Sequence, residues 1–268
     1  MHRRHFVKAG LAGAALGATG TSTADAHAAP QPAEGRMYYE LRTYELRNDL
    51  APARAASFFE QHLVPALRRA GAGQVACFTP DVGMPTPSLV LLVPYASLAD
   101  MGAAAERVAA DTTFRTARDA WERGGGPPYV RYDAALYRAF AGHPRLEVPP
   151  APPAGRPSRL FELRTYEAPN EAGLRAKMAM FNEEEIRIFR AVGFAPVFFG
   201  EAVAGARLPH LTYMVAFDDA AARNAAWGRF GAHPDWQRIR VRAGWTDPDT
   251  VSSIRAALLR PTGFSAVR

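Results

Sequence analysis

The sequence of 268 residues predicts an α+β fold in which two tandem ferredoxin-like (βαββαβ) repeats close together as an intramolecular barrel. The first observation is a repeat. The heptapeptide YELRTYE at 39–45 returns as FELRTYE at 161–167, and further matches keep the same spacing of 122 residues. The second observation is the alternation of strand and helix periodicity within each copy. The third is a proline-rich stretch between the copies, which suits a linker.

The elements of each copy follow from the period of their apolar residues. In the first copy Phe58, Phe59, Leu63 and Leu67 recur at helical spacing, and Gly71 suits a helix C-cap. The second copy repeats this helix over 174–193. We expect strands at 38–45, 74–79, 88–95 and 132–140, helical stretches within 46–71 and 96–123, and the same order in the second copy.

The N-terminal segment has the layout of a cleaved export signal. Arg3 and Arg4 precede an apolar, glycine-rich run, and small residues near Ala26 and Ala28 suit cleavage. The order Arg-Arg-x-Phe-x-Lys resembles the twin-arginine signal, which places the mature protein in a periplasm or outside the cell. The run is too short to span a bilayer, so we expect no stable membrane insertion. The expected boundaries are 1–28 for the signal, 36–141 and 158–268 for the repeats, and 142–157 for the linker.

The composition is that of an ordinary globular protein, with 48% hydrophobic and 22% charged residues. These values exclude a disordered chain, a collagen-like repeat and a coiled coil. The net charge of +6 is modest and the basic residues after the signal are spread out, so we expect no nucleic-acid partner. Cys77 is the single cysteine, which excludes an intrachain disulfide, and its predicted strand indicates a buried, unreactive thiol.

The repeated strand carries the main candidate site. Helices cover one face of a βαββαβ sheet, so the two bare faces are expected to enclose a shared interior where ligand pockets form. Alternation places Leu41 on one face of the strand and Glu40, Arg42 and Tyr44 on the other. We expect the apolar set to face the helices and the polar set to point into the interior. Arg42 would hold an anion, and Glu40 would orient Arg42 or act as a base.

A structural ladder of Glu–Arg pairs that joins the two halves is the open alternative for this row. The candidate ligand-binding residues are both copies of the row and two tryptophans: Glu40, Arg42, Tyr44, Glu162, Arg164, Tyr166, Trp227 and Trp236. No residue cluster indicates a metal site or an activated nucleophile, so catalytic residues stay unassigned.

Isolated histidines and an acidic run are expected to be structural. His62, His210 and His233 have no duplicate in the other copy and no metal-ligand spacing, which favours surface or capping roles. A single haem ligand among them stays open as an alternative, and no other cofactor is predicted. The run 183–185 of three glutamates indicates a solvated helix face.

Two motifs together resemble the NIPSNAP family. The strand YELRTY, in both copies, is similar to the start of the NIPSNAP domain, and W-x-x-F-x-x-x-P-x-W at 227–236 matches a second motif. At the positions equivalent to this second motif the first copy has Ala105, Val108, Thr112 and Phe114, so a site on that helix should be asymmetric.

This resemblance implies the dimeric α/β-barrel superfamily, and it implies fold more firmly than function. The family has no settled enzymatic activity, while related barrels include cofactor-free monooxygenases, haem enzymes and ligand-binding proteins. We expect an exported NIPSNAP-family protein that binds a small ligand or partner in its interior. The alternative is a monooxygenase-like oxidoreductase acting on a small aromatic or acidic substrate. Assembly into a homo-oligomer stays open.

Overall fold

The computed structural model describes residues 35–49, 51–150 and 158–268. The predicted export signal at 1–28 and the last part of the predicted linker, 151–157, lie outside the described residues. Residues 35–268 belong to one compact unit. Among the helices described, none has the length and apolar character needed to cross a membrane.

Both repeats contain the predicted order of strands and helices. The first repeat comprises β1 (Tyr38–Glu45), α1 (Ala51–Phe58), the π-helical turn η1 (Phe59–Leu63), α2 (Val64–Arg69), β2 (Ala76–Val82), β3 (Ser88–Tyr95), α3 (Leu98–Ala110), α4 (Thr112–Arg123) and β4 (Arg131–Ala139). The second comprises β5 (Leu160–Glu167), α5 (Glu171–Met180), η2 (Phe181–Glu185), α6 (Ile186–Ala191), β6 (Ala195–Ala204), β7 (His210–Phe217), α7 (Ala220–Ala232), α8 (Pro234–Ile239), α9 (Asp247–Thr250) and β8 (Ser253–Pro261).

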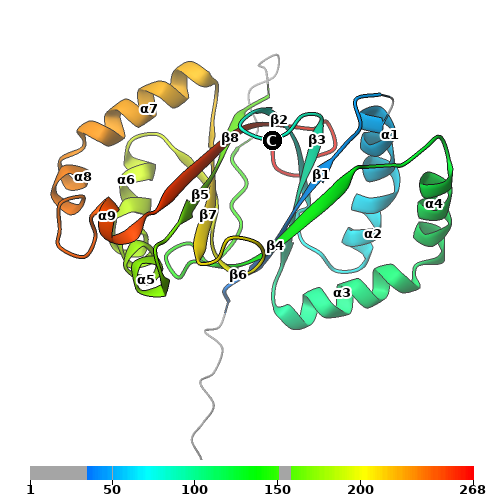
Figure 1. The fold of residues 1–268 in the computed structure, drawn as a ribbon, viewed down its shortest axis with the longest axis horizontal. Helices are drawn as coiled ribbons and strands as arrows, with labels where there is room; N and C mark the ends of the chain where they lie inside the picture. The colour runs from blue at the N-terminus through cyan, green and yellow to red at the C-terminus, as the bar shows by residue number, and fades with distance from the viewer. Residues whose placement is uncertain (1–34, 50, 151–157) are drawn as a thin grey trace, which may run out of the picture. The chain divides into compact units, whose positions relative to one another are not determined.

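These strands form one closed antiparallel barrel in the order β1-β3-β2-β8-β5-β7-β6-β4. The two repeats join at two seams, where β2 pairs with β8 and β4 pairs with β6. The helices of each repeat cover the outer face of their own half of the barrel (Figure 1). The predicted fold class, two tandem α+β repeats that close into a barrel, is confirmed.

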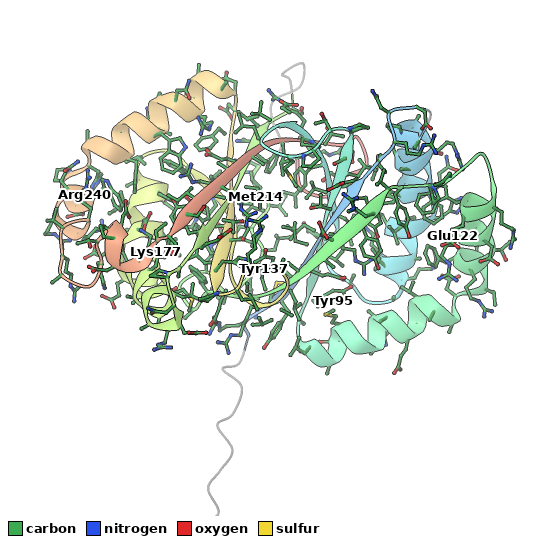
Figure 2. All side chains as sticks on the ribbon, viewed as in Figure 1. Tyr95, Glu122, Tyr137, Lys177, Met214 and Arg240 are labelled. Atoms are coloured by element: carbon green, nitrogen blue, oxygen red, sulfur yellow. The ribbon has the colours of Figure 1, made fainter. Side chains whose placement is uncertain are left out.

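Apolar side chains fill the structure in three layers. Both repeats contribute to the barrel interior, which includes Leu41, Leu163 and Met214. Two further cores lie between the sheet and the helices, one in each repeat. Figure 2 shows Met214 near the centre of the molecule, Glu122 on the side of the first repeat and Lys177 on that of the second.

The predicted facing of the repeated strand is wrong, although its alternation is right. Leu41 and Leu163 point into the barrel, whereas Arg42 and Tyr44 lie on the outer face beneath the helices. The centre of this closed barrel is lined by apolar side chains and offers no partner for a buried charge. The apolar set therefore belongs inside, and the polar set must find its partners among the helices outside.

Two local features interrupt the predicted helices. A π-helical turn lies within the first helix of each repeat at equivalent positions, and such turns are frequent at functional sites. The helical stretch predicted at 96–123 breaks at Asp111, whose carboxylate caps α4 by accepting from the backbone N–H of Phe114 at 2.9 Å. The chain therefore changes direction at Asp111.

Candidate functional site

A pocket lies in the first repeat between the outer face of the sheet and the helices that cover it. Its volume of about 360 Å³ is within the range of small-molecule sites. Arg42 and Tyr44 line it from β1, and Ala105 and Val108 line it from α3. The rest of the wall is largely aromatic and includes Phe58, Phe59, Phe114, Trp121, Tyr129 and Tyr132.

Glu40 holds the guanidinium of Arg42 at this pocket. The Nε of Arg42 donates to Glu40 Oε1 at 2.7 Å and its Nη2 donates to Oε2 at 2.8 Å. Burial lowers the pKa of Arg42, but the hydrogen bonds to the Glu40 carboxylate outweigh burial and raise the pKa above its ordinary value. Arg42 is therefore an oriented, permanent cation. A guanidinium has five N–H groups, so donors remain for a ligand.

Two further donors in the pocket wall have no hydrogen-bond acceptor within the described part of the chain. They are the buried Nε1 of Trp121 and the buried Nε of Arg118. Glu122 Oε1 lies 3.8 Å from Arg118 Nε, which is beyond hydrogen-bond distance. An unpaired buried donor costs about 1–3 kcal/mol. A ligand that supplies acceptors to these groups would recover part of that cost.

In the second repeat, donors enclose the equivalent carboxylate. Glu162 is fully buried and accepts from Arg164 Nη1 at 2.9 Å, from Arg223 Nε at 2.7 Å and from Trp227 Nε1 at 2.8 Å. Burial raises the pKa of Glu162, but the bonds from Arg223, Trp227 and Arg164 outweigh it and hold the pKa below its ordinary value. The Arg164 guanidinium lies 4.6 Å from the centroid of the Trp227 ring, within cation–π range.

A buried ion pair lies in the same repeat. Lys177 Nζ and Glu185 Oε2 are 3.4 Å apart, and each side chain is 2% exposed. Lys177 also lies 5.5 Å from the ring centroid of Trp236. The hydroxyl oxygens of Tyr166 and Tyr213 are 3.0 Å apart and form a hydrogen bond. The expectation of a solvated face at 183–185 is wrong for Glu185, because the π-helical turn directs it inward toward Lys177.

The two repeats therefore use the same strand motif differently. Ala105 and Met101 of α3 stand where α7 has Trp227 and Arg223. The indole and the second guanidinium cover the glutamate and arginine of the second repeat. The smaller side chains of the first repeat leave a pocket beside Arg42. This difference agrees with the asymmetry predicted from the incomplete tryptophan motif.

The family model for NIPSNAP matches residues 39–124 and 161–266, which is one segment in each repeat. The chain belongs to the NIPSNAP family. Each NIPSNAP segment begins within the repeated strand, β1 or β5, that carries the Glu–Arg pair. A search of curated proteins found no match to the chain.

Solved structures are similar to this NIPSNAP chain in fold. A candidate monooxygenase from Fusobacterium nucleatum subsp. nucleatum has a TM-score of 0.52 at 6% identity, covering 85% of this chain and 93% of its own. A NIPSNAP-like domain protein from Burkholderia xenovorans is 24% identical over 40% of this chain and 89% of its own, with a TM-score of 0.36. A NIPSNAP family protein from Agrobacterium tumefaciens is 19% identical over 44% of this chain and 98% of its own, with a TM-score of 0.38.

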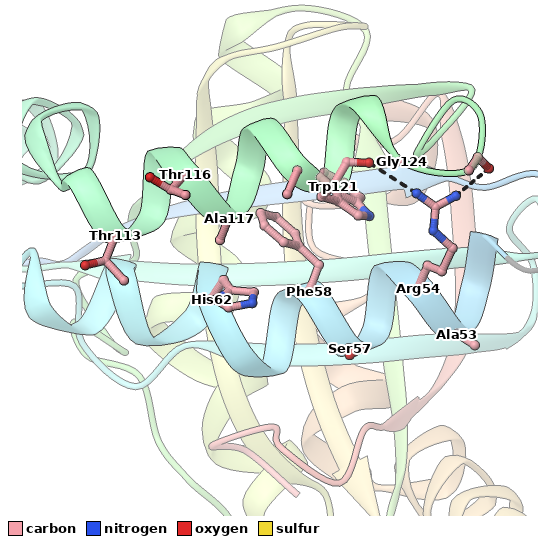
Figure 3. A pocket seen from close by; sticks show the side chains of 12 residues that line it. Ala53, Arg54, Ser57, Phe58, His62, Thr113, Thr116, Ala117, Trp121 and Gly124 are labelled. Carbon is pink, nitrogen blue, oxygen red and sulfur yellow. Dashed lines mark hydrogen bonds between the residues drawn. The ribbon is translucent and has the colours of Figure 1, made fainter.

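An open groove lies on the outside of the first NIPSNAP repeat, between α1 with η1 and α4 (Figure 3). Its volume is about 1100 Å³. Arg54 closes one end, where Nη1 donates to the carbonyl of Gly125 at 2.6 Å and Nη2 to that of Trp121 at 3.2 Å. The rings of Phe58 and Trp121 stack at 4.2 Å and line both the groove and the pocket. This stacked pair therefore separates the groove from the pocket.

The isolated histidines of the NIPSNAP repeats have different roles. His233 caps α8 by accepting from the backbone N–H of Asp235 at 3.2 Å, as expected. The expectation of a surface or capping role for His210 is wrong, because its side chain is 4% exposed and meets the hydroxyl of Tyr137 inside the barrel. His62 lines the outer groove. In the described residues, no group of His, Cys, Asp and Glu side chains is arranged to hold a metal ion.

Sequence reasoning missed Trp121 and Arg118, the two pocket donors that lack acceptors. A signal for Trp121 exists in the duplication, because this tryptophan stands where the second NIPSNAP repeat has Ala243. An aromatic residue present in one copy only marks a position where the two copies differ in packing or in function. Arg118 gives no such signal, since its counterpart is Arg240.

Proposed function

We propose that this NIPSNAP protein binds a small planar apolar molecule with a hydrogen-bond acceptor, such as a carboxylate, in the pocket of its first repeat. The proposal rests on one observation: three N–H donor groups line the same aromatic pocket. They are the Arg42 guanidinium, which Glu40 orients, and Trp121 Nε1 and Arg118 Nε, which have no acceptor among the described residues. The rings would sandwich the apolar body, and the donors would bind the acceptor group.

The second repeat would serve as a structural half. Its Glu–Arg pair is already satisfied by Arg223 and Trp227, so the pair is structural as in the alternative, but its partners lie within the second repeat and it does not join the two halves. The same motif would then have one binding copy and one structural copy.

Haem does not fit this pocket. Its lining contains no histidine, cysteine or methionine, and its tyrosines Tyr44, Tyr129 and Tyr132 pack on one another as an aromatic cluster.

Naphthalene-2-carboxylate is a suitable probe because it combines two fused rings with one carboxylate. We expect isothermal titration calorimetry to show one site per chain. Ala105→Trp places an indole where the second repeat has Trp227, and it should abolish binding. Ala110→Trp on the same helix, at an exposed position outside the pocket, is the matched control and should bind as the parent protein does.

The two arginines provide a second matched pair. A hydrogen bond to a charged group contributes about 1.5–3 kcal/mol, so Arg42→Gln should weaken binding by roughly 10- to 100-fold. Arg164→Gln removes the guanidinium of the filled repeat and should lower Tm without changing affinity. Equal affinities of the Arg42→Gln and parent proteins, or unaltered binding by Ala105→Trp, would contradict the proposal. Oxygen uptake upon addition of the probe would instead favour the oxidoreductase alternative.

We further propose that the twin-arginine segment directs export of the folded protein. Replacing Arg3 and Arg4 by lysine in the full chain, followed by cell fractionation, tests this point. Retention of the variant inside the cell is expected, and unchanged export would contradict it.

A further inference from the structure

A second cavity lies inside the barrel at the end where β1 and β5 finish. Its volume is about 620 Å³. Both repeats line it with equivalent residues, among them the pairs Leu41 and Leu163, Thr43 and Thr165, and Ala135 and Ala257. This cavity is distinct from the pocket at Arg42, because its lining lies on the inner face of the strands and shares no residue with that pocket.

One wall of this cavity carries a chain of hydrogen-bonded side chains. Thr165 and Thr212 hydroxyls are 2.8 Å apart, Thr212 donates to Tyr137 at 3.2 Å, and the Tyr137 hydroxyl is 3.2 Å from His210 Nε2. His210 Nδ1 lies 3.2 Å from the carbonyl oxygen of Arg207, an acceptor, so Nδ1 carries the proton. We call Thr165, Thr212, Tyr137 and His210 the hydroxyl chain.

The direction of the hydroxyl chain follows from the tautomer of His210. Burial lowers the pKa of His210 and keeps the imidazole neutral, so Nε2 accepts from Tyr137. Tyr137 in turn accepts from Thr212, and Thr212 accepts from Thr165. The Thr165 oxygen, which lines the cavity, therefore has lone pairs left for a donor.

The hydroxyl chain lies on one side of the barrel, and the surrounding residues make room for it. A Cβ at Gly200 would lie 2.6 Å from the Cβ of Tyr137, so the close approach of β4 and β6 at this point requires glycine there. At the equivalent seam Phe78 takes the place of Gly200, Leu259 that of Tyr137 and Val90 that of Thr212. The three positions differ together between the two seams, which indicates that one wall of the cavity is polar and the opposite wall is apolar.

The charges around the mouth balance one another. Asp133, Arg207 and Arg255 line the cavity, and Glu167 forms an ion pair with Arg255. Two carboxylates therefore accompany two guanidiniums. Unlike the pocket at Arg42, this lining has no buried side-chain donor without an acceptor among the described residues, so a charged ligand head would lose its hydration without gaining such a partner, which disfavours its entry.

We propose that this cavity is a second binding site, which takes an uncharged apolar molecule with a hydroxyl group. The apolar body lies between Leu41 and Leu163, and the hydroxyl donates to Thr165 at the end of the hydroxyl chain. The proposal is independent of the Arg42 pocket, which favours a molecule rich in acceptors.

Three probes with the same tail and different heads test the site: octan-1-ol, octanoate and octylammonium. We expect calorimetry or ligand-observed NMR to show saturable binding of octan-1-ol and at least tenfold weaker binding of the two charged probes. Ala135→Leu, which fills the cavity, should abolish binding. Ala105→Trp should leave it unchanged, so failure here is distinguishable from failure at the first pocket.

Thr165→Val and Thr43→Val form a matched pair at equivalent positions. We expect roughly a tenfold loss of octan-1-ol affinity for Thr165→Val and little change for Thr43→Val, with Tm measured for both. Equal losses for the two variants, or preference for octanoate, would overturn the proposed role of the hydroxyl chain. Saturable binding that survives Ala135→Leu would overturn the location.

Discussion

Trp227→Ala removes the side chain that covers the Glu162–Arg164 pair. The indole N–H bonds the buried Glu162 carboxylate at 2.8 Å, and a hydrogen bond to a charged group contributes about 1.5–3 kcal/mol. The ring also lies over the Arg164 guanidinium and packs against the core of the second repeat. Because Trp227 is only partly buried, we expect a total loss of about 3–5 kcal/mol, at or below that of a fully buried tryptophan.

Urea unfolding followed by circular dichroism measures this loss, and the corresponding fall in Tm is about 6–20 °C for a chain of this size. Trp227→Phe separates most of the two contributions, since it keeps an aromatic ring and removes the donor together with the smaller ring of the indole. We expect Trp227→Phe to lose about 1.5–3 kcal/mol. If that variant unfolds at the urea concentration of the parent protein, the hydrogen bond to Glu162 does not stabilise the fold and the reasoning fails.

Three further predictions follow from the buried charges and the thiol. Lys177→Met leaves Glu185 without its counter-charge and should cost about 3–5 kcal/mol in thermal unfolding, while adding Glu185→Leu should restore most of the loss. The folded-state pKa of Glu162 lies below its ordinary 4.5, so the parent protein should lose stability as pH falls below about 4.5. Glu162→Gln should lack this part of the loss of stability in acid. The same dependence of stability on pH in the two proteins would contradict the assignment. Burial raises the pKa of Cys77 to about 12, so iodoacetamide at pH 8 should modify the thiol only after unfolding, as followed by mass spectrometry.

The fold could be predicted because the duplication and the apolar periods agree. The predicted strand 38–45 matches β1 and the predicted strand 88–95 matches β3. The ends of β2 and β4, the break at Asp111 and the π-helical turns differ, and these depend on strand pairing, capping and packing. The periodicity of apolar residues alone predicts none of these features.

The facing of Glu40 and Arg42 could not be predicted because both faces of their strand are buried. Alternation sorts residues into two sets, but it does not say which set meets the helices when both environments exclude water. A charge beneath the helices can find a partner such as Arg223, whereas a charge in the apolar barrel centre cannot.

The pocket was hidden from residue-by-residue reasoning for a different reason. It results from a small side chain, Ala105, at a position where the other copy has Trp227. A search for chemically active residues passes over alanine. Comparison of the two copies, position by position, identifies both Ala105 and Trp121 as places where the repeats differ.

Joining the two halves in one chain has a consequence for how the protein can change. In a homodimer of the same architecture every substitution appears twice, so a residue that improves one site alters the other in the same way. The fused chain removes this constraint, since each gene half mutates separately. One half can keep its Glu–Arg pair covered and stabilising while the other half changes to bind new molecules. The closed barrel is kept in both cases.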